Sequence, residues 1–271
     1  MAMADGGMDF DAIKVKQQAA WATGDFAVIG SALLLASELV CEAMDVRSGW
    51  RVLDVAAGHG NSSLAAARRG CRVVSTDYVP ALLERGKMRA AAEGFRIEFL
   101  EADAENLPFG NGEFDAVIST VGVMFAPNQQ RAANELMRVC KAGGKIGLVN
   151  WTPAGFVGQI FKTIGKYIPP APGLKPPFVW GTEDGLKELF AGAAKLEIVK
   201  RVYTFRALST EDWLETFKTY YGPMNKTFAA LDAGGQAGLR ADLLELAGGL
   251  NRAEDGTMAL PGEYLEVVVM K

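Results

Sequence analysis

The chain has 271 residues, of which 49% are hydrophobic and 22% are charged, and its formal net charge at neutral pH is −4. This length and composition are typical of one folded domain with an elaboration, and they argue against extended disorder. The negative net charge gives no electrostatic reason to bind a nucleic-acid backbone or an anionic membrane, so we expect neither as a partner.

The first residues, MAMADGGMDF, lack the basic start and the apolar run of a signal peptide, so we expect no export. The most apolar segment, residues 27–40, includes Glu38 and is too short to span a bilayer, so we expect no membrane insertion. Both features favour a cytoplasmic protein.

The chain offers few residues for metal or disulfide chemistry. Its three cysteines, Cys41, Cys71 and Cys140, have neither metal-ligand nor redox spacing, which favours a reducing cytoplasm. His59 is the single histidine, and this excludes a multi-histidine metal site. We therefore expect no metal cofactor.

Between residues 51 and 151, short apolar runs alternate with helical patterns. This alternation is typical of βαβ units, in which helices cover both faces of a parallel sheet. Strands are predicted at residues 51–56, 72–77, 96–103, 114–120 and 145–151, and helices at 62–69, 80–93 and 128–139.

The pattern changes after Trp151. Residues 168–177, IPPAPGLKPP, hold five prolines and predict a loop. Beyond this loop we predict a helix at 182–190, a strand at 196–205, helices at 210–231 and 236–250, and a last strand at 263–271. The whole chain then forms a single α/β domain with a Rossmann-like, seven-stranded, mostly parallel sheet and a helical cap insertion.

The run VLDVAAGHG, residues 52–60, leads from the first strand into a glycine-rich turn. In open parallel sheets, ligands bind at the carboxyl ends of the strands where the strand order reverses. Gly58 and Gly60 would let a ligand approach the backbone, and residues 61–63 would begin a helix whose free N–H groups face that ligand. The turn reads D-x-A-x-G-x-G from Asp54, which does not match the G-x-G-x-x-G of nicotinamide dinucleotide sites.

Two further acids follow the next two strands. Asp77 lies 77 − 54 = 23 residues after Asp54, where its carboxylate could accept both hydrogen bonds of a ribose diol. Asp103 could accept from the exocyclic amine of adenine while the N–H of Ala104 donates to a ring nitrogen. Taken singly, each acid is better explained as a cap or a solvated loop residue. Together, at the ends of three successive strands, they favour an adenosine site.

The motifs from residue 52 to 151 resemble class I S-adenosylmethionine-dependent methyltransferases, and most closely the type 11 group that includes ubiquinone and menaquinone C-methyltransferases. The resemblance rests on VLDVAAGHG, VVSTDYVPALLERG, FLEADAENLPFGNGEFDAVIST and ELMRVCKAGGKIGLVNW. One departure is Ala56, which stands where the family has its first glycine and modestly narrows the turn. The resemblance implies methyl transfer from S-adenosyl-L-methionine. The apolar and aromatic content of the predicted cap indicates a small or medium-sized, hydrophobic acceptor.

The resemblance also implies an organisation of the domain. Residues 1–45 would form a helical lid, 46–151 the cofactor-binding core, 152–181 and 207–262 the substrate cap, and 263–271 the last strand. Within the lid, Gln18 and Trp21 could close the pocket over the cofactor. Alternatively, Trp21 could simply attach an N-terminal helix to the core.

Individual residues near the cofactor take roles by resemblance. Asp77 would bind the ribose, Tyr78 and Leu82 would flank the adenine, and Asp103 and Ala104 would read its edge. The methionine part would be contacted by the turn of the first strand and by residues after the fourth strand, namely Asp54, Ala56, Gly58, Gly60, Thr120 and Val121.

Methyl transfer requires alignment more than a dedicated catalytic residue, although a general base helps some acceptors. His59 could be such a base or could pack against the methionine moiety. Tyr220 and Tyr221 could hydrogen-bond a substrate or fill the core of the cap. The walls of the acceptor site are expected to include Met124, Phe125 and Trp151.

Two other functions are consistent with the sequence. A nicotinamide-dependent oxidoreductase would share the fold class, but the chain lacks that dinucleotide motif. A non-catalytic S-adenosylmethionine-binding protein would share the motifs themselves, because methyl transfer requires no obligatory nucleophile from the protein. The pattern defines neither the target atom of the acceptor nor the oligomeric state.

Overall fold

A computed structural model describes residues 8–271, and its centre is a seven-stranded sheet with the order β3-β2-β1-β4-β5-β7-β6. Five strands are parallel to one another: β1 (Arg51–Val55), β2 (Arg72–Asp77), β3 (Glu98–Glu101), β4 (Phe114–Thr120) and β5 (Cys140–Trp151). Strand β7 (Met258–Met270) is antiparallel to both β5 and β6 (Lys195–Ala207). The predicted mostly parallel α/β sheet is confirmed.

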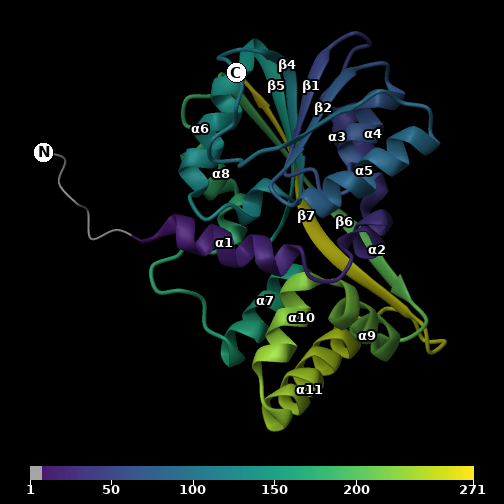
Figure 1. Cartoon of the computed structure of the whole chain (residues 1–271). Coiled ribbons are helices and arrows are strands. Elements are labelled where there is room, and N and C mark those ends of the chain that lie inside the picture. Colours follow the sequence, from purple (N-terminus) through teal and green to yellow (C-terminus); the bar gives the residue numbers. More distant parts are fainter. Residues whose placement is uncertain (1–7) are drawn as a thin grey trace, which may run out of the picture.

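Helices cover both faces of the sheet (Figure 1). On one face lie α3 (Leu34–Ala43), α4 (Asn61–Arg68) and α5 (Pro80–Ala92), and on the other lie α6 (Gln129–Val139) and α8 (Glu183–Leu189). Local sequence explains where several of them begin. Asn128 and Thr182 accept hydrogen bonds from backbone N–H groups in the first turns of α6 and α8, and Pro80 occupies the first turn of α5, where no N–H is needed.

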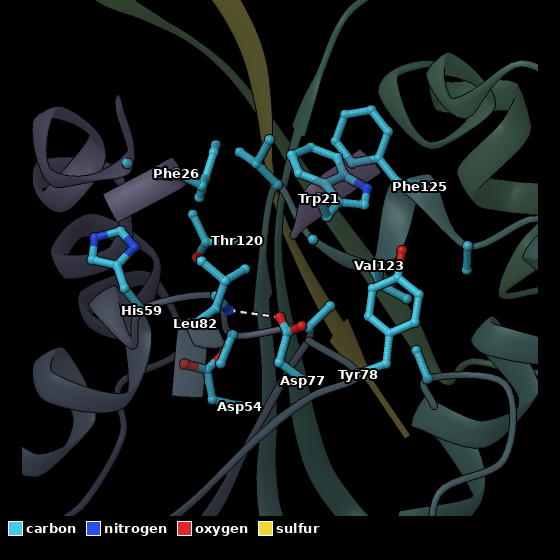
Figure 2. Close-up of a pocket in the computed structure, with 18 of the residues that line it drawn as sticks. Trp21, Phe26, Asp54, His59, Asp77, Tyr78, Leu82, Thr120, Val123 and Phe125 are labelled. Atoms are coloured by element: carbon cyan, nitrogen blue, oxygen red, sulfur yellow. Dashed lines mark hydrogen bonds between the residues drawn. The ribbon is translucent and has the colours of Figure 1, made fainter. Parts of the chain in front are cut away.

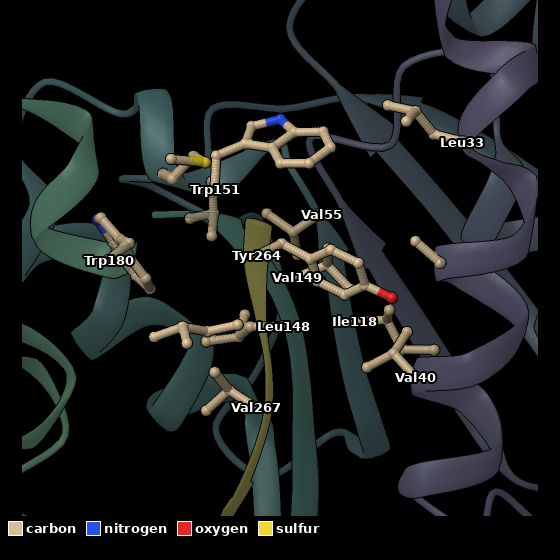
Figure 3. Packing of buried hydrophobic residues seen from close by; sticks show 14 of the residues in the cluster. Leu33, Val40, Val55, Ile118, Leu148, Val149, Trp151, Trp180, Tyr264 and Val267 are labelled. Carbon is tan, nitrogen blue, oxygen red and sulfur yellow. The ribbon is translucent and has the colours of Figure 1, made fainter. Parts of the chain in front are cut away.

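The hydrophobic core lies between the sheet and these helices (Figure 3). Buried residues of successive strands, including Val55, Ile118 and Val149, come together there. Helix α3 packs so closely on β5 that a Cβ added at Gly147 would lie 2.0 Å from Sδ of Met44. Helix α3 is therefore part of the core, and the prediction that all of residues 1–45 form a lid is wrong. Residues 1–7 of that predicted lid lie outside the described residues.

The apolar segment near the N-terminus is longer than predicted. Phe26–Ala43 has a mean hydropathy of 1.8 over 18 residues, so by length and composition alone it could cross a membrane. The structure divides it into α2 (Phe26–Gly30), a 3-10 turn (Ser31–Leu33) and α3. Within α3, Val40 and Cys41 are fully buried. In this fold the segment thus serves as one of the layers that cover the sheet.

A helical lobe lies below the sheet in Figure 1. It contains α7 (Phe156–Tyr167), α9 (Thr210–Tyr220), α10 (Gly222–Ala230) and α11 (Ala233–Leu250). The lobe is connected to the sheet by β6 and β7, two strands of 13 residues each that pair along their whole length. These two strands place the lobe beside the loops that follow the parallel strands.

Two predicted boundaries in this part of the chain are wrong. The helix predicted at 210–231 is two helices, because Tyr221 has extended backbone angles (φ −87°, ψ 101°) and Pro223 lacks the N–H that a continuous helix needs. The last strand begins at Met258 and not at residue 263. It includes Pro261, which is tolerated because β5 pairs with β7 only as far as Tyr264.

Candidate functional site

Two adjoining cavities lie where the parallel strands end. The larger cavity has a volume of about 970 Å³, its open mouth included, and the smaller, apolar cavity has about 490 Å³. Five residues line both and form the common wall, namely Trp21, Phe26, Leu33, Val121 and Phe125. A ligand in one cavity would therefore lie next to a ligand in the other.

The larger cavity is surrounded by the loops that follow β1, β2, β3 and β4 (Figure 2). Carboxyl ends of parallel strands meet at one edge of a sheet, which is why these loops converge. Thirteen of the candidate site residues named from the sequence line this cavity: Trp21, Asp54, Ala56, Gly58, His59, Asp77, Tyr78, Leu82, Asp103, Ala104, Thr120, Val121 and Phe125. The three strand-end acids thus face a single space.

Asp77 is held by two backbone hydrogen bonds. Its Oδ2 accepts from the N–H of Gly58 and its Oδ1 from the N–H of Val79, both at 2.8 Å, and Figure 2 shows the first of these bonds. Burial raises the pKa of Asp77 to about 6, although these hydrogen bonds oppose the rise. At neutral pH the group is mainly an oriented carboxylate. Each of its oxygens keeps a lone pair that can accept from a ligand hydroxyl.

Asp54 lies deeper, with 1% of its surface exposed. Its Oδ2 accepts from the hydroxyl of Ser63 at 2.6 Å, whereas its Oδ1 has no hydrogen-bond partner among residues 8–271. Burial, with a smaller contribution from the charge of Asp77, raises the pKa of Asp54 to about 7. A buried carboxylate oxygen without a partner, facing a cavity, is suited to a cationic or hydrogen-bond-donating ligand.

Hydroxyl groups from three elements meet beside Asp54. The Oγ of Ser62 lies 2.6 Å from Oγ1 of Thr120 and donates to Oγ of Ser37 at 3.1 Å. Ser62 and Asn61 belong to the first turn of α4, whose free N–H groups favour an anion. No sequence motif marks Ser37. The one feature that could have pointed to it is that it is a small polar residue within an apolar helical run.

Helix α1 (Phe10–Trp21) lies beside the mouth of the larger cavity, between the sheet and the helical lobe (Figure 1). Trp21, at its end, packs edge-on against Phe26, Phe125 and Tyr221 at ring-centroid distances of 5.6, 5.2 and 5.5 Å. These partners come from α2, from the loop after β4 and from the α9–α10 junction. Trp21 therefore joins an aromatic cluster and also lines both cavities.

Comparisons with known proteins agree with this arrangement. A family model described as a methyltransferase domain matches residues 53–148. An uncharacterized protein of Mycobacterium tuberculosis is 41% identical over 268 residues, which are 94% of this chain and 93% of the relative. A demethylmenaquinone methyltransferase of Clavibacter sepedonicus is 37% identical over 126 residues, which are 46% of this chain and 51% of the relative. The chain belongs to the class I methyltransferases.

Solved structures share the fold of this methyltransferase. The YcgJ protein from Bacillus subtilis has a TM-score of 0.61 at 18% identity, over 87% of this chain and 98% of that chain. Phosphoethanolamine N-methyltransferase 2 of Haemonchus contortus, solved in complex with S-adenosyl-L-methionine, has a TM-score of 0.53 at 18% identity, over 87% of this chain and 52% of that chain. At these identities the similarity concerns the fold alone.

His59 is a wall residue of the methyltransferase's larger cavity. Both ring nitrogens are buried without a hydrogen-bond partner in the described part of the chain. Burial, followed by the charge of Arg89, lowers the pKa of His59 to about 4, so the imidazole is neutral at neutral pH. It packs against Phe26 and so closely against Gly30 that a Cβ there would lie 2.4 Å from its Cε1. These surroundings leave His59 a weak proton acceptor.

Several predicted site residues of the methyltransferase lie outside the larger cavity. Met124 is fully buried in the core, because the 3-10 turn Val123–Phe125 points Phe125 and not Met124 toward the cavities. Tyr220 is 37% exposed and lines neither cavity, since α9 ends there and presents the following residue instead. The side chain of Gln18 donates to the carbonyl of Tyr78, and Gly60 forms the left-handed start of α4 (φ 84°).

The apolar cavity is formed mainly by the helical lobe. It is lined by aliphatic and aromatic side chains, which besides the common wall are Ile29, Trp151, Val157, Ile160, Phe161, Phe205, Phe217, Tyr221 and Met224. Two predicted residues, Trp151 and Tyr221, lie here. The hydroxyl of Tyr221 forms no hydrogen bond with any described residue, and burial raises its pKa. This hydroxyl is therefore available to a ligand.

The floor of the larger cavity contains unusual backbone. Ala56 (φ 52°) and Val121 (φ 57°) both adopt the left-handed region that favours glycine. A Cβ added at Gly122 would lie 2.3 Å from the carbonyl oxygen of Ala56, so the loops after β1 and β4 pass very close to each other. Such strain occurs where neighbouring structure imposes it, and it is common at functional sites.

Replacing Ala56 by glycine is expected to stabilise the methyltransferase by roughly 0.5–1 kcal/mol. Relief of a left-handed alanine gains about 1–2 kcal/mol, and the greater freedom of glycine in the unfolded chain removes part of it. Ala57, outside the left-handed region, is the matched control, and Ala57→Gly should destabilise. Urea unfolding of both variants measures the difference. A loss of stability in Ala56→Gly would contradict the interpretation of strain at this position.

Proposed function

We propose that this methyltransferase transfers the methyl group of S-adenosyl-L-methionine to a small or medium-sized, hydrophobic acceptor. The observation that carries the proposal is the pair of cavities with a common wall, one surrounded by three strand-end acids and the other apolar. The acids fit a nucleoside and a cationic amino acid, and the apolar cavity fits the acceptor. The common wall would bring the two reacting atoms together.

The nucleoside would lie along β2 and the loop after β3. Asp77 would accept from the ribose hydroxyls with the lone pairs that its two backbone hydrogen bonds leave free. Tyr78 and Leu82 would flank the adenine. Asp103 would accept from the exocyclic amine, and the N–H of Ala104 would donate to the ring.

The methionine part would lie over the turn of residues 56–60. Its ammonium group suits the unpaired Oδ1 of Asp54, and its carboxylate suits the N–H groups in the first turn of α4. The hydroxyl of Thr120, held by Ser62, faces the same space. A ligand end with both an ammonium and a carboxylate group would explain why acids, hydroxyls and a helix N-terminus converge on one end of the cavity.

When bound, S-adenosylmethionine supplies an electrophilic methyl group on a sulfonium. The acceptor atom would form a bond to the methyl carbon as the carbon–sulfur bond breaks, and the sulfur would keep the electron pair. The chain contributes alignment, since the walls of the two cavities fix donor and acceptor in line and keep water out. Tyr221 would orient an acceptor through its free hydroxyl, and a neutral His59 would at most accept a proton weakly.

The proposed setting is the cytoplasm, without nucleic acid or membrane insertion. The net charge of −4 and the free state of Cys41, Cys71 and Cys140 are consistent with it.

Calorimetric titration with S-adenosylmethionine and S-adenosylhomocysteine tests the cofactor. We expect micromolar binding of both and no binding of nicotinamide dinucleotides. A panel of small thiols, phenols and amines, with S-adenosylhomocysteine formation as the readout, then tests turnover. Absence of binding would refute the cofactor, and binding without turnover on any apolar acceptor would favour a non-catalytic binder.

The apolar cavity can be tested separately by filling it. Val157 lines only this cavity, so Val157→Phe should reduce its volume without touching the larger one. We expect the fluorescent probe 8-anilinonaphthalene-1-sulfonate to bind roughly fivefold more weakly, because overfilling a packed site forces side chains out of place, while the affinity for S-adenosylhomocysteine is unchanged. Lys162→Phe, at an exposed position of the same helix, is the control. Equal loss in both variants would contradict this assignment.

A further inference from the structure

Lys14, which no sequence motif marks, joins helix α1 to the loop after β3. Its Nζ lies 2.8 Å from Oδ2 of Asp103 and 3.2 Å from Oε2 of Glu105. Only 17% of the Lys14 side chain is exposed. Among the described residues that line the larger cavity, it is the only lysine or arginine. A partly buried cation therefore lies at the end of the cavity where Asp103 would read the adenine.

The carboxylates that meet Lys14 are fixed from the other side by backbone. Asp103 accepts from the N–H of Glu105 at 2.9 Å, and Glu105 accepts from the N–H of Asn128 at 2.7 Å. Burial lowers the pKa of Lys14, but hydrogen bonds to Asp103 and Asp11 and the charge of Glu105 outweigh it, and the pKa is raised above its usual value. Lys14 thus stays charged throughout the physiological range.

Lys14 and Gln18 lie on the same side of α1, four residues apart. Gln18 donates to the carbonyl of Tyr78, next to the carboxylate of Asp77. Helix α1 is therefore attached at two points to the loops after β3 and β2, both of which would hold the nucleoside. Lys16, between them in sequence, is exposed and forms no hydrogen bond or ion pair with the described residues.

We propose that Lys14 is a positioning residue for adenine, which acts by fixing the Asp103 carboxylate that accepts from the exocyclic amine. This inference rests on the proposed function. Asp103 Oδ2 accepts from Lys14, Oδ1 accepts from the backbone, and each oxygen keeps a second lone pair for the amine. The same contact is one of the two points that attach α1 beside the cavity, so the Asp103 carboxylate takes part both in recognition of the adenine and in placement of the helix.

The position of α1 also links the Lys14–Asp103 contact to the apolar cavity that would hold the acceptor. Trp21 ends the helix that Lys14 holds, and it lines the apolar cavity as well as the larger one. A cofactor that strengthens the Lys14–Asp103 contact would therefore also stabilise the wall against which the acceptor lies.

The test compares two ligands in two matched variants. S-adenosylhomocysteine and its 6-deamino analogue differ only in the exocyclic amine, so the ratio of their dissociation constants reports amine recognition. In Lys14→Met we expect S-adenosylhomocysteine to bind roughly tenfold more weakly, which corresponds to one hydrogen bond to a charged group at a partly exposed site. The analogue should lose much less affinity, so the ratio should fall severalfold. Lys16→Met should change neither value, and Lys14→Arg should restore most of the ratio.

The Asp103→Asn variant completes the comparison. We expect it to lower the ratio by itself, and adding Lys14→Met to it should lower the ratio no further, because both changes act on the same contact. If Lys14→Met weakens both ligands equally, Lys14 only attaches the helix and the proposal is overturned. Failure of the unmodified protein to bind S-adenosylhomocysteine would instead overturn the proposed function, so the two failures are distinguishable.

Discussion

Asp77→Asn is expected to weaken the binding of S-adenosylhomocysteine by roughly 100- to 1,000-fold, because hydrogen bonds to a charged group contribute about 1.5–3 kcal/mol each. One ribose hydroxyl would lose its acceptor, and the other would donate to a neutral oxygen in place of a charged one. The neutral amide has a similar size but presents N–H groups to one of the two sides. Whichever oxygen the NH2 group replaces, it would face a backbone N–H, that of Gly58 or that of Val79, and would repel it. The variant therefore disturbs the turn of residues 56–60 as well as the diol, and both effects weaken binding.

The neighbouring strand provides the control for Asp77. Glu101 pairs in register with Asp77 at the end of β3 but is exposed to solvent. Glu101→Gln removes one negative charge at nearly the same place and should leave the affinity within about twofold, since exposed charges contribute little. Circular dichroism and thermal unfolding of both variants separate a local loss of binding from a loss of fold. A folded Asp77→Asn that binds as well as the unmodified chain would mean that this carboxylate does not hold the nucleoside.

Local sequence predicted the sheet and the acids around the larger cavity well. The strands at residues 72–77 and 114–120 have the predicted boundaries. Both are short buried runs, with Asp77 at the end of one and Thr120 at the end of the other, so the pattern itself shows where they stop. The convergence of Asp54, Asp77 and Asp103 then follows from the parallel arrangement, which brings strand ends together whatever lies between them in the chain.

Side-chain direction in the less regular parts could not be predicted in this way. Tyr220 and Tyr221 are adjacent, and which of them reaches the apolar cavity depends on where α9 ends. The same holds for Met124 and Phe125 in a single 3-10 turn. Hydrophobicity does not separate the members of either pair, since a rotation of about 100° per helical residue decides which side chain faces the cavity.

Contacts between distant segments were also beyond the sequence pattern. Lys14 and Asp103 are 89 residues apart, and nothing in the polar surface of α1 marks Lys14 against Lys16. Ser37 lies in a helix that precedes the matched family domain, and its role depends on the position of that helix beside Ser62. Such residues become visible only when the packing of α1 and α3 is known.

The affinity for S-adenosylhomocysteine is expected to fall steeply below pH 7, because Asp54 must be ionised to bind the ligand's ammonium group. The folded-state pKa of Asp54 is about 7, against an ordinary value of 3.8. Below pH 7 the unliganded protein therefore carries a proton on Asp54, and binding must release it. The affinity then decreases by up to tenfold per pH unit, or roughly 25-fold between pH 7.5 and 5.5 from this group alone.

Two neighbouring groups, Asp77 and His59, determine the pH range in which the titration of Asp54 can be observed by itself. Asp77, with a pKa of about 6, makes the decrease steeper below pH 6, whereas His59, with a pKa of about 4, titrates below this range. Asp54→Asn should bind more weakly and lose most of the pH dependence of its affinity between pH 6 and 7.5, with only the contribution of Asp77 left. Calorimetry in buffers of different ionisation enthalpy should detect about half a proton released at pH 7 by the unmodified chain and close to none by the variant.

The same raised pKa has an opposite consequence for the unliganded fold. Between about pH 4 and 7 the folded chain keeps a proton on Asp54 that the unfolded chain has lost, so this group lowers the stability of the unliganded protein as the pH rises. The ligand's ammonium group compensates the buried charge, and the stabilisation that the ligand gives should grow with pH over this range. Equal stabilisation by S-adenosylhomocysteine at pH 5.5 and 7.5, measured as the shift in Tm, would show that Asp54 does not face the ammonium group.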